Sequence, residues 1–156
     1  MINPEFSERQ QTRSDTLFSL DGRVAIVTGA LGLLGQQHCR ALAEAGATVI
    51  ATDIRSEQCE EFATEISPGL HLSSGRIVGM ASDVTSPESL QNLRDAVLDR
   101  YGRIDILVNN AAVNDMFENP AVAGDLSKFE NYPLEMFQQS LDVNITGVFL
   151  CSQILG

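Results

Sequence analysis

Short apolar runs alternate with longer segments of helical period along most of this chain. Four runs rich in valine, isoleucine and other apolar side chains predict buried strands over 23–28, 48–52, 76–82 and 104–108. Between and after these runs, apolar residues recur every three or four positions, which predicts helices over 34–45, 56–66, 87–101 and from about 133 to the end. This alternation indicates a parallel sheet with helices on both faces.

The predicted fold class is therefore α/β, a doubly wound parallel sheet with strand order 3-2-1-4. Crossovers between parallel strands are right-handed almost without exception, and ligands bind where the strand order reverses. We expect residues 1–17 to be a disordered leader and residues 18–156 to be one dinucleotide-binding domain, truncated after the fourth strand and its following helix. The polar segment 114–132 has no clear period and is predicted to be a loop, either over a substrate or at the surface.

Three glycines follow the first predicted strand at a spacing of three residues, namely Gly29, Gly32 and Gly35. Gly29 lets the chain turn off the strand, Gly32 lets a pyrophosphate approach the backbone, and Gly35 lets the helix lie close to the sheet. The first N–H groups of that helix would face a phosphate. A structural turn is the alternative, but the strand before the glycines and the helix after them favour dinucleotide binding.

Asp53 ends the next apolar run, 18 residues after Gly35. A carboxylate in this place can accept hydrogen bonds from ribose hydroxyls, each worth about 1.5–3 kcal/mol. A 2′-phosphate about 4 Å away would be repelled by up to about 4 kcal/mol at an effective dielectric of about 20. Arg55 would offset part of this repulsion, but a cation directly after the acid would be better placed, and Ile54 stands there. We therefore expect NAD as the cofactor rather than NADP.

Composition and charge narrow the classes of partner. The formal net charge is −11 and Lys128 is the single lysine, which argues against nucleic acid or an anionic membrane. Cys39, Cys59 and Cys151 form no CxxC pair and have no metal-ligand spacing to a histidine, so neither a metal site nor a disulfide framework is expected. Without a long apolar run or a signal peptide, a cytoplasmic location is expected.

Four stretches, taken in order, carry a family resemblance. They are residues 18–29, the turn Asp83-Val84-Thr85, the stretch 109–112 (Asn-Asn-Ala-Ala) and the stretch 142–147 (Asp-Val-Asn-Ile-Thr-Gly). Together they resemble the opening, the adenine-binding turn, the Asn-Asn-Ala-Gly motif and the asparagine-bearing helix of the short-chain dehydrogenase/reductase family. The resemblance covers 18–156 and implies a Rossmann-type oxidoreductase that transfers a hydride between a nicotinamide and an alcohol or ketone.

The resemblance also implies a role for each matching residue. Gly29, Gly32, Leu33, Leu34 and Gly35 would line the pyrophosphate turn. Asp53 would hold the adenosine ribose, with Ile54 beside it, and Asp83 and Val84 would contact the adenine. Asn110, Ala111 and Ala112 would flank the nicotinamide-side ribose. Asn144 is the catalytic residue of the set. It would bend its helix by bonding backbone groups through a water molecule, and it would thereby support a proton relay. The alternatives are that Asp83, Asn109 and Asn110 are turn formers and that Asn144 is an ordinary polar helix residue.

Two features depart from the family's pattern. The spacing Thr-Gly-x-x-Gly-x-x-Gly resembles the family's epimerase-like branch, whereas 109–112 resembles the dehydrogenase branch. The family's proton donor is a Tyr-x-x-x-Lys pair preceded by a serine, and the fourth residues after Tyr101 and Tyr132 are Asp105 and Met136. We expect the catalytic serine, tyrosine and lysine beyond Gly156, so this chain would be the inactive cofactor-binding half of a longer enzyme.

The last predicted helix is apolar on nearly all sides, and such a helix is buried or lies in an interface. In the family the corresponding helix contacts a second subunit, so a homo-oligomer through this helix is expected, with an alcohol or ketone as substrate. The alternative function is a non-catalytic nucleotide-binding module. A methyltransferase with the same sheet fits poorly, because Thr28 rather than an acid precedes the glycines.

Overall fold

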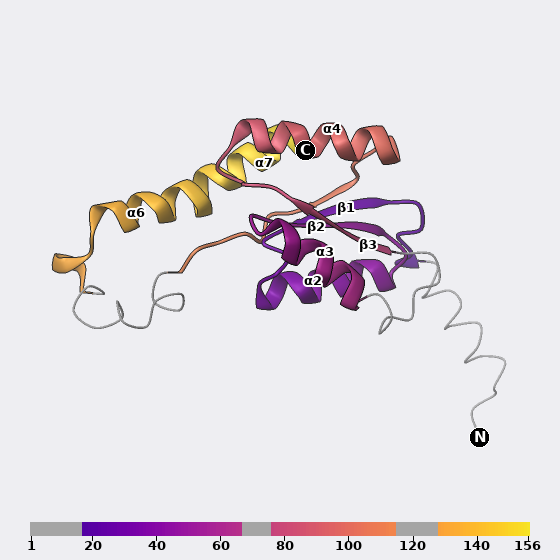
Figure 1. Ribbon diagram of the computed structural model, residues 1–156, viewed down its shortest axis with the longest axis horizontal. Helices are drawn as coiled ribbons and strands as arrows, with labels where there is room; N and C mark the ends of the chain where they lie inside the picture. Colours follow the sequence, from indigo (N-terminus) through magenta and orange to yellow (C-terminus); the bar gives the residue numbers. More distant parts are fainter. Residues whose placement is uncertain (1–16, 67–75, 115–127) are drawn as a thin grey trace, which may run out of the picture.

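The computed structural model describes residues 17–66, 76–114 and 128–156 (Figure 1). Its elements are β1 (Val24–Thr28), α2 (Leu33–Glu44), β2 (Thr48–Asp53), α3 (Ser56–Ile66), β3 (Arg76–Ala81), α4 (Pro87–Tyr101), β4 (Ile106–Val108), η3 (Phe129–Asn131), α6 (Leu134–Leu141), η4 (Asp142–Gly147) and α7 (Val148–Leu155). The expected leader, apart from Leu17, and most of the predicted 114–132 loop lie outside the described residues.

The four strands form one parallel sheet in the order β3-β2-β1-β4, which confirms the predicted topology. β1 lies between β2 and β4, and Ala25 is in register with both Val49 and Ile106. The predicted strands agree with the observed ones to within one residue, except that β4 begins at Ile106 and not at residue 104. The backbone N–H of Asp105 bonds the Val24 carbonyl at 2.8 Å, but the ladder itself starts one residue later.

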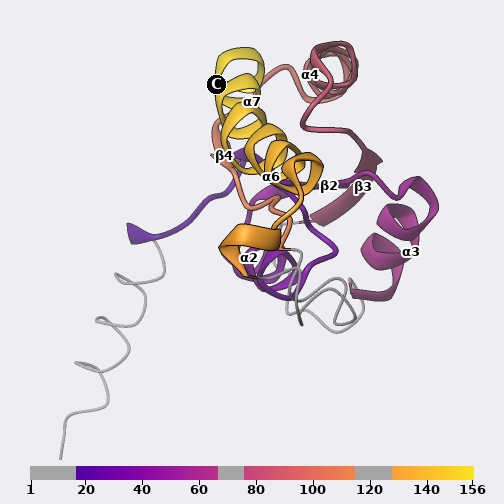
Figure 2. The same ribbon diagram turned by 90° about the vertical axis from the view of Figure 1, so that its left-hand side faces the viewer.

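Helices cover both faces of the sheet, as Figures 1 and 2 show. On one face, Cys39 and Ala43 of α2 and Ala63 and Ile66 of α3 pack against the sheet. On the other face, a second cluster contains buried residues of α4 (Leu90, Leu93, Val97) and of α7 (Cys151, Leu155). Alternate residues of β1 enter the two clusters, since side chains of a strand point to opposite faces in turn. This is the reason that β1 is an unbroken apolar run.

The C-terminal helix differs from the single helix that the sequence predicts. It is divided into α6, the π-helical segment η4 and α7, and it runs from the end of α6, which extends away from the sheet in Figure 1, to α4. α6 contains no buried residue, whereas α7 buries Cys151 and Leu155. Of the two predicted outcomes for this helix, burial or an interface, burial within the chain is therefore not seen for α6, and the interface stays a prediction.

Asp105 fastens the amino-terminal ends of β1 and β4. Its carboxylate accepts hydrogen bonds from the Val24 N–H at 2.9 Å, from Arg23 Nη1 at 2.9 Å and from Arg103 Nε at 2.7 Å. The Asp105 side chain is only 11% exposed. Hydrogen bonds from Arg103, and then from Val24, hold the pKa of this carboxyl well below its usual range.

We expect Asp105→Asn to lower the urea midpoint of unfolding at pH 7. Because the pKa is lowered in the folded state, the carboxylate stabilises the fold above the ordinary aspartate pKa of about 3.9, and that contribution is lost as the pH falls below it. The loss of stability in Asp105→Asn should therefore become smaller as the pH falls from 5 to 3, through the ordinary aspartate pKa of about 3.9. Asp95→Asn, at a 61% exposed carboxylate paired with Arg94, is the control and should change little. An Asp105→Asn deficit that is independent of pH would contradict this account.

Candidate cofactor site

Two glycines in the turn at the end of β1, Gly29 and Gly35, have no space for a side chain. Gly29 has a φ of +61°, and a Cβ on it would lie 2.7 Å from the Cα of Ala111. A Cβ on Gly35 would collide with the Gly29 carbonyl oxygen and lie 2.8 Å from the Cα of Ala30. The turn, the start of α2 and the segment after β4 are therefore packed backbone to backbone, which fixes the path of the chain.

Gly32 is less tightly surrounded than Gly29 and Gly35. It is the N-cap residue of α2 with φ −73° and ψ 165°, and no side chain caps the helix there. A Cβ on Gly32 would meet only the Gly29 carbonyl oxygen, at 3.3 Å. Leu33 and Leu34 in the first turn are 85% and 64% exposed, and that turn carries no acidic residue. Helix-initial N–H groups without a side-chain cap and without a nearby carboxylate can receive an anion.

Thr28 joins the turn to the segment after β4. Its buried hydroxyl accepts hydrogen bonds from the backbone N–H groups of Asn110 and Ala111, both at 3.0 Å. In return, the side-chain amide of Asn110 donates to the carbonyl oxygens of Thr28 and Gly29, both at 3.0 Å. The Asn110 side chain is thus engaged with the glycine turn. Ala111 and Ala112 follow it at the same edge of the sheet.

Asp53 ends β2 next to this turn. The chain is tied to its neighbours there, because Ala30 N–H donates to the Thr52 carbonyl and Ser82 N–H donates to the Asp53 carbonyl, both at 3.0 Å. The Asp53 side chain is 11% exposed and forms an ion pair with Arg55, whose Nε lies 3.1 Å from Oδ1. Ile54 is 71% exposed. The carboxylate that the sequence singles out therefore lies at the carboxyl edge of the sheet.

Asp83 and Val84 follow β3 at the same edge. Oδ1 of Asp83 accepts from the N–H and from the hydroxyl of Thr85, at 2.8 and 2.7 Å. This is the turn-forming arrangement that the sequence left open as an alternative. Val84 is 8% exposed and belongs to the core cluster under α4 and α7. A Cβ on Gly147 would lie 3.0 Å from its Cγ2, so Val84 packs directly on the π-helical segment.

Asn144 lies within that π-helical segment and binds the chain after β4 directly. Its Oδ1 accepts from the Val113 N–H at 2.9 Å, and its Nδ2 donates to the Val113 carbonyl at 3.1 Å. The sequence-based expectation of a contact to backbone groups through a water stays a prediction, and the direct bonds to Val113 are an additional contact. The side-chain amide of Asn144 thus bonds both the backbone N–H and the backbone carbonyl of Val113. Asn144 thereby fixes the helix to the segment that carries Asn110–Ala112.

Three contributors to this site were not predicted, namely the hydroxyl of Thr28, the backbone of Val113, and the pair in which Asn109 Nδ2 donates to Ser152 Oγ at 3.2 Å. A hydroxyl residue at the end of an apolar strand, directly before the first glycine, was a signal for Thr28. Neither Val113 nor Ser152 is marked in the sequence, because each acts only through the approach of a distant segment.

The cysteines offer no reactive thiolate at neutral pH. Burial raises the pKa of Cys39 to about 12 and that of Cys151 to about 11, and it also raises the pKa of Cys59. Within residues 17–66, 76–114 and 128–156, no cluster of histidine, cysteine or acidic side chains could hold a metal ion. Over the same ranges, no helix has the length and apolar character needed to cross a membrane.

Comparison with known proteins identifies the family to which the chain is similar. The model of the family described as short chain dehydrogenase matches residues 23–155. D-threitol dehydrogenase of Mycolicibacterium smegmatis is 35% identical over 150 residues, which cover 96% of this chain and 52% of that protein. NAD-dependent glycerol dehydrogenase of Listeria innocua is 30% identical over 142 residues, which cover 91% of this chain and 49% of that protein.

Solved structures give the same result. A short-chain type dehydrogenase/reductase from Mycobacterium marinum superposes with a TM-score of 0.75 at 33% identity, over 90% of this chain and 51% of that one. The Pseudomonas aeruginosa RhlG/NADP active-site complex superposes with a TM-score of 0.67 at 32% identity, over 88% of this chain and 46% of that one. The chain spans about half the length of the relatives that it matches.

Proposed function

This chain belongs to the short-chain dehydrogenase family, and we propose that it binds NAD for hydride transfer between the nicotinamide and a small alcohol or ketone. The observation that carries the proposal is the position of Asp53, a nearly buried carboxylate at the end of β2, beside the uncapped start of α2. A carboxylate there suits ribose hydroxyls, and the uncapped helix suits a pyrophosphate. Relatives named as dehydrogenases of polyols support this class of reaction.

The preference for NAD over NADP rests on charge. The Asp53 carboxylate can accept two ribose hydroxyls, whereas a phosphate in place of one hydroxyl would bring a second negative charge close to it. The relatives do not decide the matter, since one is named as NAD-dependent and another structure is described as an NADP complex. The residues of this chain favour NAD because Ile54, an exposed apolar residue, directly follows the acid.

We propose that the residues at the carboxyl edge bind and orient the coenzyme, which supplies the hydride chemistry. Gly29, Gly32 and Gly35, with Leu33 and Leu34, would take the pyrophosphate. Asp83 and Val84 would border the adenine, the latter through its backbone because its side chain is buried. Ala111 and Ala112, held through Asn110, would flank the nicotinamide-side ribose.

Proton transfer needs residues that this sequence does not contain. It has no Tyr-x-x-x-Lys pair, and a general acid or base typically contributes about 10²–10⁴ in rate. We propose that turnover requires a serine, tyrosine and lysine supplied from outside these 156 residues, with Asn144 positioning the helix that supports the relay. The absence of the pair also favours a second candidate, a non-catalytic nucleotide-binding module. Turnover of alcohols by the full-length protein would support the enzyme and exclude the module.

Calorimetric titration with NAD and with NADP tests the cofactor assignment. We expect NAD to bind at least about tenfold more tightly, which corresponds to about 1.4 kcal/mol. Equal affinities would contradict the preference for NAD. If neither cofactor bound, the nucleotide-binding function itself would be wrong.

A homo-oligomer through the C-terminal helix is part of the proposal. Large apolar side chains are exposed along α6, η4 and α7, between 37% and 63% each: Leu134, Phe137, Leu141, Ile145, Val148 and Phe149. Contiguous exposed apolar surface of this kind is typical of an interface. Light scattering should give at least a dimer, and Phe137→Glu with Phe149→Glu should shift it toward the monomer. A wild-type monomer at micromolar concentration would contradict this part of the proposal.

We also propose a cytoplasmic location, because the three cysteines show no disulfide framework.

A further inference from the structure

The turn that follows β3 holds Asp83 by nearly all of its polar groups. The carbonyl oxygen of Asp83 accepts the Ser86 N–H at 3.1 Å, and its Oδ1 accepts the N–H and the hydroxyl of Thr85. The N–H of Asp83 donates to Ser89 Oγ at 3.0 Å. In the part of the chain that the structure describes, no hydrogen bond reaches Oδ2. Because Asp83 is exposed, this oxygen remains for a ligand.

Ser89, in the first turn of α4, makes the contact to the N–H of Asp83. Its Oγ also lies 3.3 Å from Ser82 Oγ, and Ser82 is 4% exposed. The Ser82 N–H donates to the carbonyl oxygen of Asp53 at 3.0 Å. Ser89 itself is fixed by the N-cap residue Ser86, whose Oγ accepts the Ser89 N–H at 3.3 Å. The hydroxyl of Ser89 therefore joins the backbone of Asp83, through Ser82, to the end of β2.

A carboxylate oxygen in a fixed position can distinguish nucleobases by hydrogen bonding. Adenine carries an exocyclic amino group that donates, whereas hypoxanthine carries a carbonyl oxygen in the same place and can only accept there. A bond to Oδ2 of Asp83 would therefore form with adenine, and the hypoxanthine oxygen would face a negative charge instead. Because hydrogen bonds weaken steeply as their geometry worsens, this discrimination depends on how firmly Asp83 is held.

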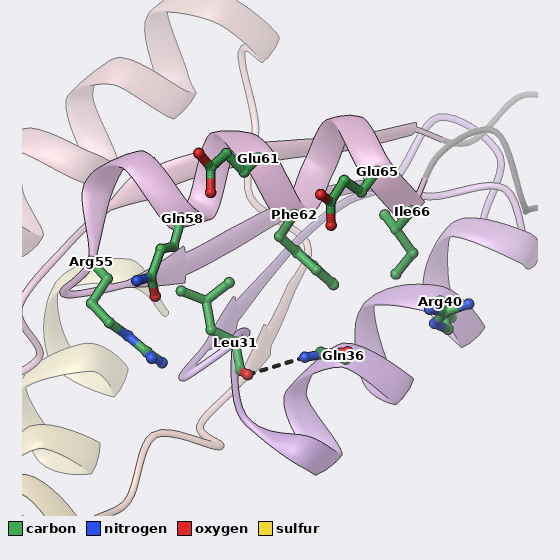
Figure 3. A pocket seen from close by; sticks show the side chains of 9 residues that line it. All are labelled: Leu31, Gln36, Arg40, Arg55, Gln58, Glu61, Phe62, Glu65 and Ile66. Atoms are coloured by element: carbon green, nitrogen blue, oxygen red, sulfur yellow. Dashed lines mark hydrogen bonds between the residues drawn. The ribbon is translucent and has the colours of Figure 1, made fainter.

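The hollow between α2 and α3, shown in Figure 3, is the alternative place for a base. Its volume is about 430 Å³, within the range of small-ligand pockets. Leu31 of the glycine turn and Arg55 line one end of it, and Glu65 lines it farther along α3 (Figure 3). None of the residues 76–101, all of which the structure describes, lines this hollow. A base bound there would be recognised by other side chains, and its selectivity would not depend on Asp83.

Resting on the proposed function, we propose that Ser89 is a positioning residue for the adenine: its hydroxyl holds the backbone of Asp83 so that Oδ2 accepts the amino group of the base. The two carboxylate oxygens of Asp83 then have different partners, since Oδ1 bonds Thr85 and Oδ2 bonds the ligand. A turn-forming role for Asp83 and a role at the adenine are thus compatible. Loss of the Ser89 hydroxyl should weaken binding of the adenine coenzyme and leave binding of a hypoxanthine analogue nearly unchanged.

Calorimetric titration with NAD and with nicotinamide hypoxanthine dinucleotide tests the inference. The wild type should bind NAD at least about tenfold more tightly than the analogue. Ser89→Ala should lower this ratio of affinities by at least about threefold, whereas Ser89→Thr, which keeps the hydroxyl, should keep the ratio within about twofold of the wild-type value. Asp83→Asn should bring the ratio to within about threefold of one, because the amide can donate to the hypoxanthine oxygen.

Ser86→Ala is the matched control, because it removes the N-cap bond at the start of the same helix and keeps the Ser89 hydroxyl. It should lower the urea midpoint of unfolding and leave the ratio of affinities within about twofold of the wild-type value. If Ser86→Ala lowered the ratio as much as Ser89→Ala does, the ratio would follow the stability of α4, and the inference would be overturned.

The other outcomes separate the inference from the proposed function. Tight binding of NAD without preference over the analogue would overturn the inference and leave NAD binding standing. An unchanged ratio in Asp83→Asn, or in Ser89→Ala with the wild-type melting temperature, would do the same. If the wild type bound neither dinucleotide, the proposed function would fail first and the inference with it.

Discussion

Replacement of Gly35 by alanine is expected to destabilise the fold and to weaken NAD binding by at least about tenfold, which corresponds to about 1.4 kcal/mol. The new Cβ would collide with the Gly29 carbonyl oxygen and would lie 2.9 Å from Asn110 Nδ2. Two of its three nearest atoms, the Gly29 carbonyl oxygen and the Ala30 Cα, are backbone atoms in a tight turn, so α2 must move away from that turn. Overpacking of this kind costs about 1–3 kcal/mol. Urea unfolding and calorimetric titration with NAD measure the two effects.

Two neighbouring glycines serve as controls for this prediction. Gly32→Ala adds a methyl group that meets a single atom, the Gly29 carbonyl oxygen at 3.3 Å, so it should cost less stability than Gly35→Ala. It should weaken NAD binding, because Gly32 is the N-cap of α2, where the pyrophosphate is proposed to bind. Gly22→Ala places a side chain at a φ of +73° with nothing within 4 Å, so it should cost about 1 kcal/mol of stability through strain and leave binding intact. If Gly35→Ala bound NAD normally, the proposed place of the pyrophosphate would be wrong.

The second large effect is expected for Thr28→Val. Valine keeps the shape of the side chain but removes the oxygen that accepts the N–H groups of Asn110 and Ala111. A buried donor left without a partner costs about 1–3 kcal/mol, and two donors are affected here. The free energy of unfolding should fall accordingly, and NAD binding should weaken, because the segment after β4 would no longer be held to the glycine turn. Urea unfolding followed by circular dichroism, together with NAD titration, would show both.

Thr52 offers a matched control on the adjacent strand. It is paired with Thr28 in the register of β1 and β2, and both side chains are 1% exposed. Among the described residues, however, Thr52 Oγ1 has no hydrogen-bond partner. Thr52→Val should therefore be neutral or stabilising, since it replaces an unsatisfied hydroxyl by a methyl group. Equal losses in the two variants would indicate that the hydroxyl bonds of Thr28 contribute nothing specific.

The layout of the sheet could be predicted from the sequence because it depends on local pattern and on few topological rules. Unbroken apolar runs marked the strands, and right-handed crossovers with a reversal of strand order gave 3-2-1-4. Helix signals were equally local: Ser86 accepts the Ser89 N–H at 3.3 Å, and Gly46 follows α2 with a φ of +105°. Asp53 could be placed at the carboxyl edge for the same reason, since it directly follows a strand.

Other features of the site could not be predicted, because they depend on segments that meet only in the fold. Thr28 and Asn110 are 82 residues apart, and no spacing rule connects them. Asn144 and Val113 are 31 residues apart, and no spacing rule predicts their direct pairing. The Asp53–Arg55 pair is close in sequence, but whether Arg55 turns back to the acid or outward depends on the start of α3. The candidate residues thus carry the chemistry, while their mutual orientation comes from tertiary contacts.

The π-helical segment Asp142–Gly147 makes the exact residue count of the C-terminal helix matter. Each residue advances an α-helix by about 100°, and a π-type turn takes up residues that a regular helix would place elsewhere around its axis. Deleting one residue within η4 would let the wide turn close into a regular α-helical turn, and Cys151 and Leu155 would still face α4. Deleting one residue at the start of α7 would instead rotate the residues after it by about 100° and turn Leu155 toward water. One-residue deletions should therefore be tolerated within η4 and rejected within α7.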